Sequence, residues 1–213
     1  MSLKVTKIED FAYKIDEERP ESSSIKRITF NKEMEISENM FQGLSNEQRI
    51  ALEKFAKREN LFLTGPAGTG KTYLIKKMYE LASMNSSKKI AVCAMTGCAA
   101  LLLECNAKTL HSWSGIKLAK GTKEEVVKSV LFNKFALKSW KSAQTIILDE
   151  VSMLSKKVFE IIEEIGRRVK HSDLPFGGMQ VVFIGDFFQL PPIETHGQPD
   201  SGKFCFETPL WYA

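Results

Sequence analysis

The sequence predicts an α/β domain built on a mostly parallel sheet with helices on both faces. Three observations lead to this prediction. From residue 44 onward, short apolar segments alternate with segments of helical period; a glycine-rich loop separates one predicted strand from a predicted helix; and polar motifs directly follow other predicted strands. Ligands of such sheets bind beyond the carboxyl ends of the strands, so we expect these motifs to meet at one edge.

The helices and strands follow from the spacing of apolar residues. The clearest helical period has apolar side chains at Val158, Ile161, Ile162, Ile165 and Val169. In chain order, the pattern predicts helices at 46–58, 71–84, 98–105, 122–139 and 155–170, and strands at 60–64, 89–95, 144–148 and 179–184.

Composition excludes several protein classes. The 213 residues are 43% hydrophobic and 26% charged, which is typical of a globular domain and not of a coiled coil or a disordered chain. No apolar run is long enough to span a membrane, and the N-terminus resembles neither a signal peptide nor a transit peptide. We therefore expect an intracellular protein, in the nucleus or in the nucleoid or cytoplasm, without membrane partners. The four cysteines lack CxxC spacing, so neither a zinc site nor a disulfide framework is predicted.

The charge distribution suggests a boundary near residue 44. Residues 1–43 carry 7 basic and 9 acidic side chains and show no sustained period, which predicts a partly flexible N-terminal extension with a short strand at 25–30. Residues 44–213 carry 23 basic and 17 acidic side chains and form the predicted folded domain.

The glycine-rich loop fits the phosphate-binding pattern G-x-x-x-x-G-K-[ST]. Its residues are Gly65, Pro66, Ala67, Gly68, Thr69, Gly70, Lys71 and Thr72. Glycines let the backbone N–H groups approach the phosphates, with the N-terminus of the next helix behind them. Lys71 would reach the β- and γ-phosphates, and the Thr72 hydroxyl would bind Mg²⁺. The strand–loop–helix context disfavours an ordinary glycine-rich turn, so we predict an ATP site.

Two later motifs supply groups for ATP hydrolysis. The apolar strand that ends at Leu148 is followed by Asp149, which can hold Mg²⁺, and by Glu150, which can polarise the attacking water. After the next strand, two prolines stiffen the loop that carries Gln189, whose amide can donate to the γ-phosphate. An acidic pair or a proline-rich turn alone is weak evidence, but both follow a phosphate-binding loop here.

Taken together, six motifs resemble the first motor domain of PIF-type DNA helicases, in superfamily 1B, whose relatives include RecD-type enzymes. They are LSNEQ at 44–48, GPAGTGKT at 65–72, TGCAA at 96–100, TLHSW at 109–113, DEVS at 149–152 and GDFFQLPP at 185–192. The resemblance covers about 44–213, and the phenylalanine-rich last motif points to the PIF type.

The resemblance implies a RecA-like P-loop NTPase domain that uses ATP and Mg²⁺. Gln48 would read the adenine, and translocation would run 5′ to 3′ on single-stranded DNA. Such helicases build the ATP site between two similar domains, the second of which supplies an arginine. No arginine here lies in such a motif, so we expect the chain to hold the first domain, to bind nucleotide and to hydrolyse it poorly alone. We expect a monomer.

Five residues are candidates for contact with DNA. Thr96 can cap the helix that starts at Gly97, leaving N–H groups free for a DNA phosphate. His111 resembles a strand-contacting histidine of the family. Trp113 either stacks on a base or packs in the core, and of Phe187 and Phe188 one is expected to pack while the other lies near DNA. We expect Phe188 to be the one that lies near DNA.

A lysine-rich stretch is a further candidate DNA face. Residues 108–141 contain eight lysines and only two acidic residues, Glu124 and Glu125. The stretch is either a solvated helix face or a surface that neutralises phosphates.

Two other functions remain possible on the sequence alone. A P-loop kinase for small molecules would need an arginine-rich lid, yet arginine is absent after Arg168. A non-catalytic module that binds ATP and single-stranded DNA would have no use for Glu150.

Overall fold

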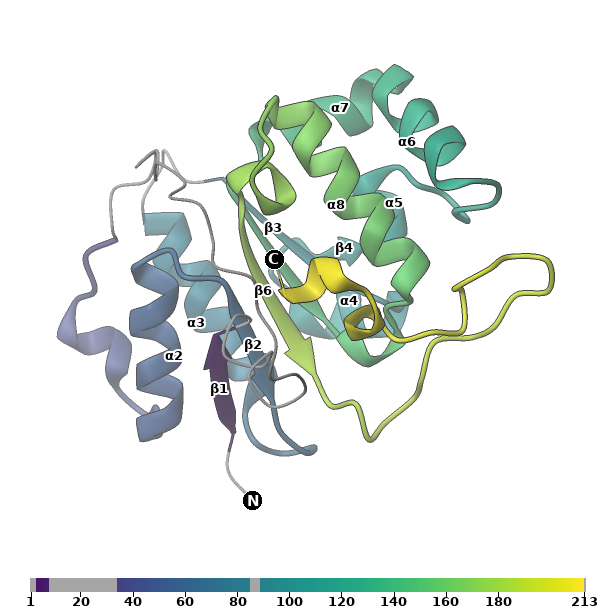
Figure 1. Cartoon of the computed structure of the whole chain (residues 1–213). Coiled ribbons are helices and arrows are strands. Elements are labelled where there is room, and N and C mark those ends of the chain that lie inside the picture. Colours follow the sequence, from purple (N-terminus) through teal and green to yellow (C-terminus); the bar gives the residue numbers. More distant parts are fainter. Residues whose placement is uncertain (1–2, 8–33, 85–88, 213) are drawn as a thin grey trace, which may run out of the picture.

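A computed structural model of the chain describes residues 3–7, 34–84 and 89–212. Within them lies a six-stranded sheet of order β1-β2-β6-β5-β3-β4 (Figure 1). Every pairing is parallel except that of β1 with β2. The strands are β1 (Lys4–Lys7), β2 (Leu61–Thr64), β3 (Ile90–Ala94), β4 (Lys108–Thr109), β5 (Thr145–Asp149) and β6 (Gln180–Gly185). The predicted parallel α/β fold is confirmed.

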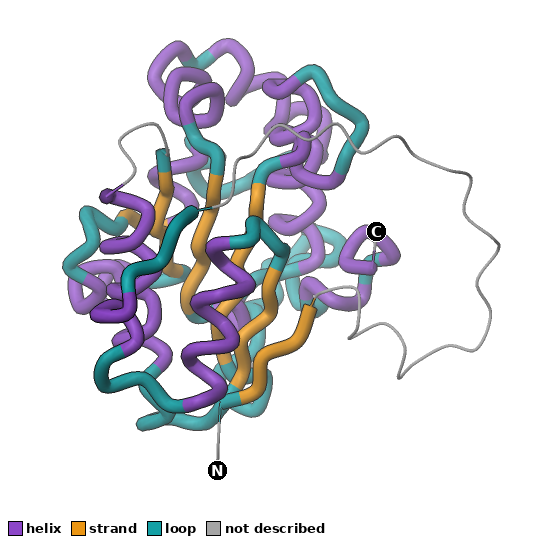
Figure 2. The backbone as a smooth tube through the Cα atoms, turned by 90° about the vertical axis from the view of Figure 1, so that its left-hand side faces the viewer, coloured by secondary structure: helices purple, strands orange, loops and turns teal. Residues whose placement is uncertain are grey.

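Helices cover both faces of the sheet (Figure 2). One core contains buried residues of α2 (Asn46–Ala56), α3 (Lys71–Met84) and α4 (Gly97–Leu103). The other contains buried residues of α5 (Leu110–Ser114), α6 (Lys123–Phe132), α7 (Lys134–Ser142) and α8 (Lys156–Lys170). Short 3-10 turns are η1 (Glu38–Phe41), η2 (Val151–Met153), η3 (Pro175–Gly178), η4 (Cys205–Glu207) and η5 (Pro209–Tyr212). Among the described segments, no helix has both the length and the apolar character needed to cross a bilayer.

The single helix predicted at 122–139 is wrong, because the chain forms two helices there. Asn133 ends α6 and caps α7, and its Oδ1 accepts hydrogen bonds from the backbone N–H groups of Phe135 and Ala136 at 3.1 and 3.2 Å. The apolar spacing continues through this point, but the asparagine side chain offers the backbone a local alternative to continued helix. The resulting corner directs α7 back toward the start of β5.

The segment expected as an N-terminal extension contributes to the folded domain. Strand β1 pairs antiparallel with β2, so it covers the edge of the strand that precedes the phosphate-binding loop. Leu3, Met34 and Met40 are buried in the core beneath α2 and α3. The strand predicted at 25–30 lies outside the described residues.

Gly166 allows α8 to pack closely on η3, and we predict that Gly166→Ala destabilises the protein. A Cβ at this position would lie 2.8 Å from the carbonyl oxygen of Phe176 and 2.9 Å from its carbonyl carbon. Alanine normally gains about 1 kcal/mol over glycine in a helix, but a backbone clash of this kind costs about 1–3 kcal/mol. Urea denaturation should show a lower free energy of unfolding. Ser129→Ala, on the exposed face of α6, is the control and should leave it unchanged or slightly higher.

Candidate functional site

The phosphate-binding loop connects β2 to α3 in the predicted conformation. Gly68 and Gly70 have φ angles of +81° and +80°, a region that glycine enters at little cost. The Thr69 hydroxyl donates to the carbonyl oxygen of Pro66 at 2.9 Å, which closes the loop on itself. The loop then runs directly into the first turn of α3, where unpaired N–H groups and the helix dipole favour an anion.

The Lys71 side chain lies against the loop. Its Nζ donates to the carbonyl oxygens of Gly65 at 2.6 Å and Pro66 at 2.9 Å. The ammonium group is therefore held where the loop curves and not extended into solvent. A phosphate oxygen carries a full charge and is a stronger acceptor than either carbonyl, so a bound nucleotide would attract this ammonium group.

Asp149 ends β5 as a buried carboxylate. Only 7% of the residue is exposed, and burial raises the pKa of its carboxyl group to about 6. The neighbouring charge of Glu150 raises this pKa further, whereas a hydrogen bond from the Glu150 N–H and the positive charge of Lys71 oppose the shift. Strands β2 and β5 flank β6 and run parallel to it, so the phosphate-binding loop with Lys71 and the end of β5 with Asp149 lie at the same edge of the sheet.

Glu150 has a strained backbone. Its φ of +59° lies in the left-handed region, and the chain turns there from β5 into η2. A non-glycine residue in this region costs about 1–3 kcal/mol and persists where the surroundings fix it, frequently at functional sites. The strained turn therefore marks Glu150 as a candidate functional residue.

The residues present fit a magnesium ion. Thr72 lies exposed in the first turn of α3, which follows β2, and Asp149 is the carboxylate at the end of β5, on the other side of β6. A hydroxyl and a carboxylate are the hard oxygen donors that Mg²⁺ takes, and proteins usually hold it with one or two such groups together with substrate phosphates and water.

Gln48 links the start of α2 to the phosphate-binding loop. Its Oε1 accepts from the Ser45 N–H at 2.9 Å in a capping box, and its Nε2 donates to the Thr69 carbonyl oxygen at 3.3 Å. Both ends of the amide are engaged, so reading an adenine would require exchange of one of these bonds. The structure brings Gln48 to the loop, and its contact with adenine stays a prediction.

Gln189 lies exposed in the loop that follows β6. The Asp186 side chain organises this loop: one oxygen accepts from the Phe188 N–H at 3.1 Å, and the other accepts from Gln189 Nε2 at 3.2 Å. Because β6 is hydrogen-bonded between β2 and β5, the loop leaves the sheet at the edge that carries Lys71 and Asp149. Its role as a γ-phosphate sensor stays a prediction.

Four of the five residues expected to contact DNA follow β3 and β4, and the fifth, Phe188, follows β6. Thr96 caps α4 as predicted, with its hydroxyl accepting from the Ala99 N–H at 3.2 Å while Gly97 begins the helix. His111 is half-buried in α5, and burial lowers the pKa of its imidazole below 6.5. The side chain is therefore neutral at neutral pH, and it would meet DNA by hydrogen bonding or packing, without charge.

The structure separates the packing aromatic residues from the exposed ones. The ring of Trp113 lies 4.7 Å from that of Trp140, which gives it a packing role without testing contact with a base. Phe187 packs against Phe206 at 4.9 Å and joins an aromatic cluster. Phe188, by contrast, is fully exposed (relative exposure 101%).

Ser152 is a site residue to which sequence reasoning gave no role. Its hydroxyl is fully buried and has no hydrogen-bond partner among the described residues. An unpaired buried hydroxyl costs about 1–3 kcal/mol, and this one lies two residues after Glu150, in the turn that also contacts Gly185. Its place in the DEVS motif is the signal that could have identified it.

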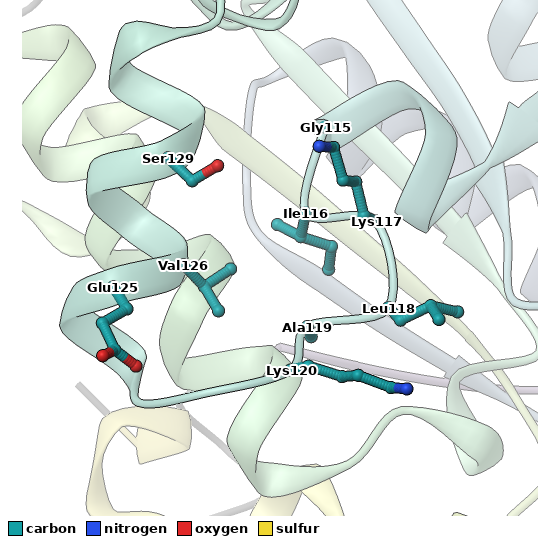
Figure 3. A pocket seen from close by; sticks show the side chains of 9 residues that line it. All are labelled: Gly115, Ile116, Lys117, Leu118, Ala119, Lys120, Glu125, Val126 and Ser129. Carbon is teal, nitrogen blue, oxygen red and sulfur yellow. The ribbon is translucent and has the colours of Figure 1, made fainter.

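A cavity of about 280 Å³ between residues 115–120 and α6 lies apart from these groups (Figure 3). Ile116 and Val126 line it, and the Lys120 amine points away from α6. It includes none of the residues predicted to bind ATP.

Comparison with known proteins identifies the family of the chain. The family model for PIF1-like helicase matches residues 43–212. The chain is 39% identical over 166 residues to the ATP-dependent DNA helicase RRM3 of Saccharomyces cerevisiae, covering 78% of this chain and 23% of that protein. The chain thus spans under a quarter of the length of this relative.

Solved structures agree with the fold. The crystal structure of Pif1 helicase from Candida albicans matches with a TM-score of 0.71 and 36% identity, over 79% of this chain and 37% of that one. Pif1 helicase from Bacteroides in complex with ADP-AlF3 and ssDNA matches with a TM-score of 0.63 and 30% identity, over 78% and 39%. Fold, motifs and matched length agree: the chain belongs to the PIF1-like helicase family.

Proposed function

We propose that the chain is the first motor domain of an ATP-dependent DNA helicase that moves 5′ to 3′ on single-stranded DNA. The observation that carries the proposal is that Lys71 and Asp149 follow two parallel strands, β2 and β5, that flank β6, so both lie at one edge of the sheet with Glu150 next to Asp149. The relatives are named ATP-dependent DNA helicases. We place the whole protein in genome maintenance (repair, recombination, replication and telomere maintenance), in the nucleus or in the nucleoid or cytoplasm.

The chemistry assigns each residue a separate task. The loop from Gly65 to Gly70 and Lys71 bind the phosphates of ATP. Thr72 and Asp149 would hold Mg²⁺, which would supply positive charge near the transferred phosphoryl group. Glu150 takes a proton from the attacking water. Gln189 then reports whether the γ-phosphate is present.

The DNA side of the motor follows the neighbouring strands. Thr96, Gly97 and His111 hold the strand, while Trp113 and Phe188 offer aromatic surface to the bases. Both sets of groups lie in loops and helices that directly follow strands of one sheet, so a change of loop position on loss of the γ-phosphate can reach the DNA strand.

Replacing Glu150 with glutamine tests the proposal. We make the substitution in the complete helicase, because the chain alone is expected to hydrolyse ATP poorly. The variant should bind ATP as tightly as the unsubstituted helicase or more tightly. It should lose ATP turnover stimulated by single-stranded DNA by a factor of about 10²–10⁴, because the amide cannot accept the proton. Binding is measured with a fluorescent ATP analogue and turnover by phosphate release. Glu53→Gln, at an exposed position of α2, is the matched control.

Equal turnover in the Glu150→Gln variant and the parent would remove Glu150 as the base. It would favour a module that uses ATP only as a ligand.

A further inference from the structure

The corner between α6 and α7 exposes two phenylalanines. Phe132 is 78% exposed and Phe135 is 85% exposed, on either side of the Asn133 cap. The core side of these helices is formed by other residues, among them Val127, Val130 and Trp140, all fully buried. The two phenyl rings therefore contribute little to the core. Exposed aromatic residues gathered in this way mark surfaces that meet a partner.

Lysines surround the two rings. Residues 126–142 contain four lysines and no acidic residue. All four lysines are exposed, and none forms an ion pair within the described parts of the chain. We call this surface the α6–α7 patch; it consists of Lys128, Phe132, Lys134, Phe135, Lys138 and Lys141.

The nearby carboxylates do not neutralise the patch. Glu124 forms an ion pair with Arg168 of α8 at 2.8 Å. Glu125 accepts from the Thr122 N–H at 2.8 Å in the capping box of α6. Both lie in the first turn of α6, at the opposite end of that helix from Phe132. The positive charge of the α6–α7 patch is therefore available to an anionic partner.

Helical spacing pairs each ring with a lysine. Lys128 and Phe132 are four residues apart on α6, and Phe135 and Lys138 are three apart on α7, so each pair lies on one helix face. Lys134, Lys138 and Lys141 follow one another at i, i+4 and i+7 on α7. The patch thus presents cations and aromatic faces side by side on two short, rigid helices.

The patch lies away from the nucleotide site. Helix α7 ends at Ser142, shortly before β5 begins at Thr145, whereas the phosphate-binding loop and Asp149 follow strand ends. In Figure 1, α6 and α7 lie at the top, and the arrowhead of β6 points to the opposite end. A strand held by Thr96 and His111 after β3 and β4 would not need these helices.

We propose that the α6–α7 patch is a second binding surface for single-stranded DNA. Lysines neutralise the phosphates, and bases stack on Phe132 and Phe135, a combination suited to unpaired strands because their bases are free to stack. Two other anionic partners fit the patch less well. Duplex DNA keeps its bases stacked on one another, and an acidic protein segment has no bases that could stack on Phe132 and Phe135. The proposal deepens the proposed function and rests on it for the choice of DNA as the nucleic acid.

The test measures binding of a fluorescent oligothymidylate to the 213-residue chain by anisotropy. We expect the double variant Phe132→Ala/Phe135→Ala to bind about tenfold more weakly or worse, because stacking on each ring is lost. We expect Lys134→Gln/Lys138→Gln to flatten the slope of log affinity against log salt by about 1.4, since each phosphate contact on a single strand contributes about 0.7.

Matched controls change exposed residues elsewhere. Met84→Ala removes an apolar side chain that is 65% exposed, and Lys57→Gln/Lys89→Gln removes two exposed lysines. These variants should bind the oligothymidylate as the parent does. Binding of a fluorescent ADP analogue, unchanged in every variant, shows that each protein is folded.

Three results would overturn the proposal. The first is parental affinity and salt slope in both patch variants. The second is an equal loss for blunt duplex DNA in the phenylalanine variant, which would mean that the rings do not stack on bases. The third is a larger loss for a phenylalanine-containing polyglutamate peptide than for the oligothymidylate, which would assign the patch to an acidic protein partner.

The two proposals fail separately in this experiment. If the parent chain does not bind the ADP analogue, the proposed motor function fails, while the effect of the patch variants on oligothymidylate binding still decides the patch. If the ADP analogue binds normally and the patch variants match the parent, only the patch proposal fails.

Discussion

Replacing Asp149 with asparagine is expected to stabilise the unliganded protein near neutral pH while removing its response to Mg²⁺. The carboxyl group has a pKa of about 6 in the folded protein against 3.8 as the ordinary value, chiefly because burial disfavours its charged form. Asparagine keeps the shape and can still accept the hydrogen bond that the Glu150 N–H donates at 3.0 Å. It carries no charge to desolvate.

The pH dependence follows from linkage. Between pH 3.8 and about 6 the folded state binds more protons at Asp149 than the unfolded state does, so the free energy of unfolding falls as pH rises through this window. Stability from this group is complete below pH 3.8 and lost above about 6. Above the window, the ionised carboxylate costs the folded state on the order of 3 kcal/mol.

Urea denaturation at several pH values measures the effect. We expect Asp149→Asn to raise the free energy of unfolding by about 3 kcal/mol near pH 7.5 and to have little effect near pH 3.5. Asp173→Asn, an exposed aspartate after α8, controls for the change in net charge. A loss of stability in Asp149→Asn near neutral pH would show that the carboxylate is stabilised by its surroundings and not strained by burial.

The same substitution should impair function although it raises stability. Mg²⁺ requires the ionised carboxylate, so the parent chain should bind nucleotide more tightly with Mg²⁺ than without it, and Asp149→Asn should lose this difference. Titration calorimetry of ADP with and without Mg²⁺ measures both. The active-site charge would then be a case in which the protein gives up stability for function.

Replacing Lys71 with alanine is expected to weaken binding of ATP by a factor of about 30–150. Two charge-assisted hydrogen bonds to phosphate are each worth about 1.5–3 kcal/mol. Part of this gain is offset, because Nζ must leave the carbonyl oxygens of Gly65 and Pro66, which it now contacts at 2.6 and 2.9 Å. A net loss of about 2–3 kcal/mol remains.

The comparison of ligands makes this test specific. Lys71→Ala should reduce affinity for ATP, measured by fluorescence of a labelled analogue, and leave affinity for adenosine unchanged, because adenosine has no phosphates. Lys76→Ala removes a lysine from the same helix that is paired with Glu104 at 2.6 Å, and it should bind ATP as the parent does. Equal losses in the two variants would indicate a general charge effect and not a phosphate contact.

Local chemistry explains which elements could be predicted from the sequence. The helix predicted at 71–84 begins and ends where α3 does, because the glycine loop before it and the apolar period within it are properties of neighbouring residues. Gly68 and Gly70 take positive φ angles as the phosphate-loop motif requires. The predicted cap at Thr96 also depends only on the next three residues.

The predictions that were wrong or incomplete depend on competition or on distance. At Asn133 the side chain competes with the helix for backbone N–H groups, and the apolar period gives no sign of which one wins. The pairing of Lys4–Lys7 with Leu61–Thr64 joins segments far apart in the chain, so no local pattern could indicate it. The structure also shows where the residues predicted to contact DNA lie, but their contacts with DNA remain predictions.

By itself, the sequence determined the class of fold, the phosphate-binding loop and the acidic pair, because glycine conformations, helical period and strand-end motifs are encoded within short windows. The tertiary structure decided the environment of these groups. Burial at the end of β5 raises the pKa of Asp149, the aromatic cluster takes Phe187 and leaves Phe188 exposed, and the corner at Asn133 exposes Phe132 and Phe135. Desolvation and packing depend on all neighbours in space, and those neighbours are brought together only by folding.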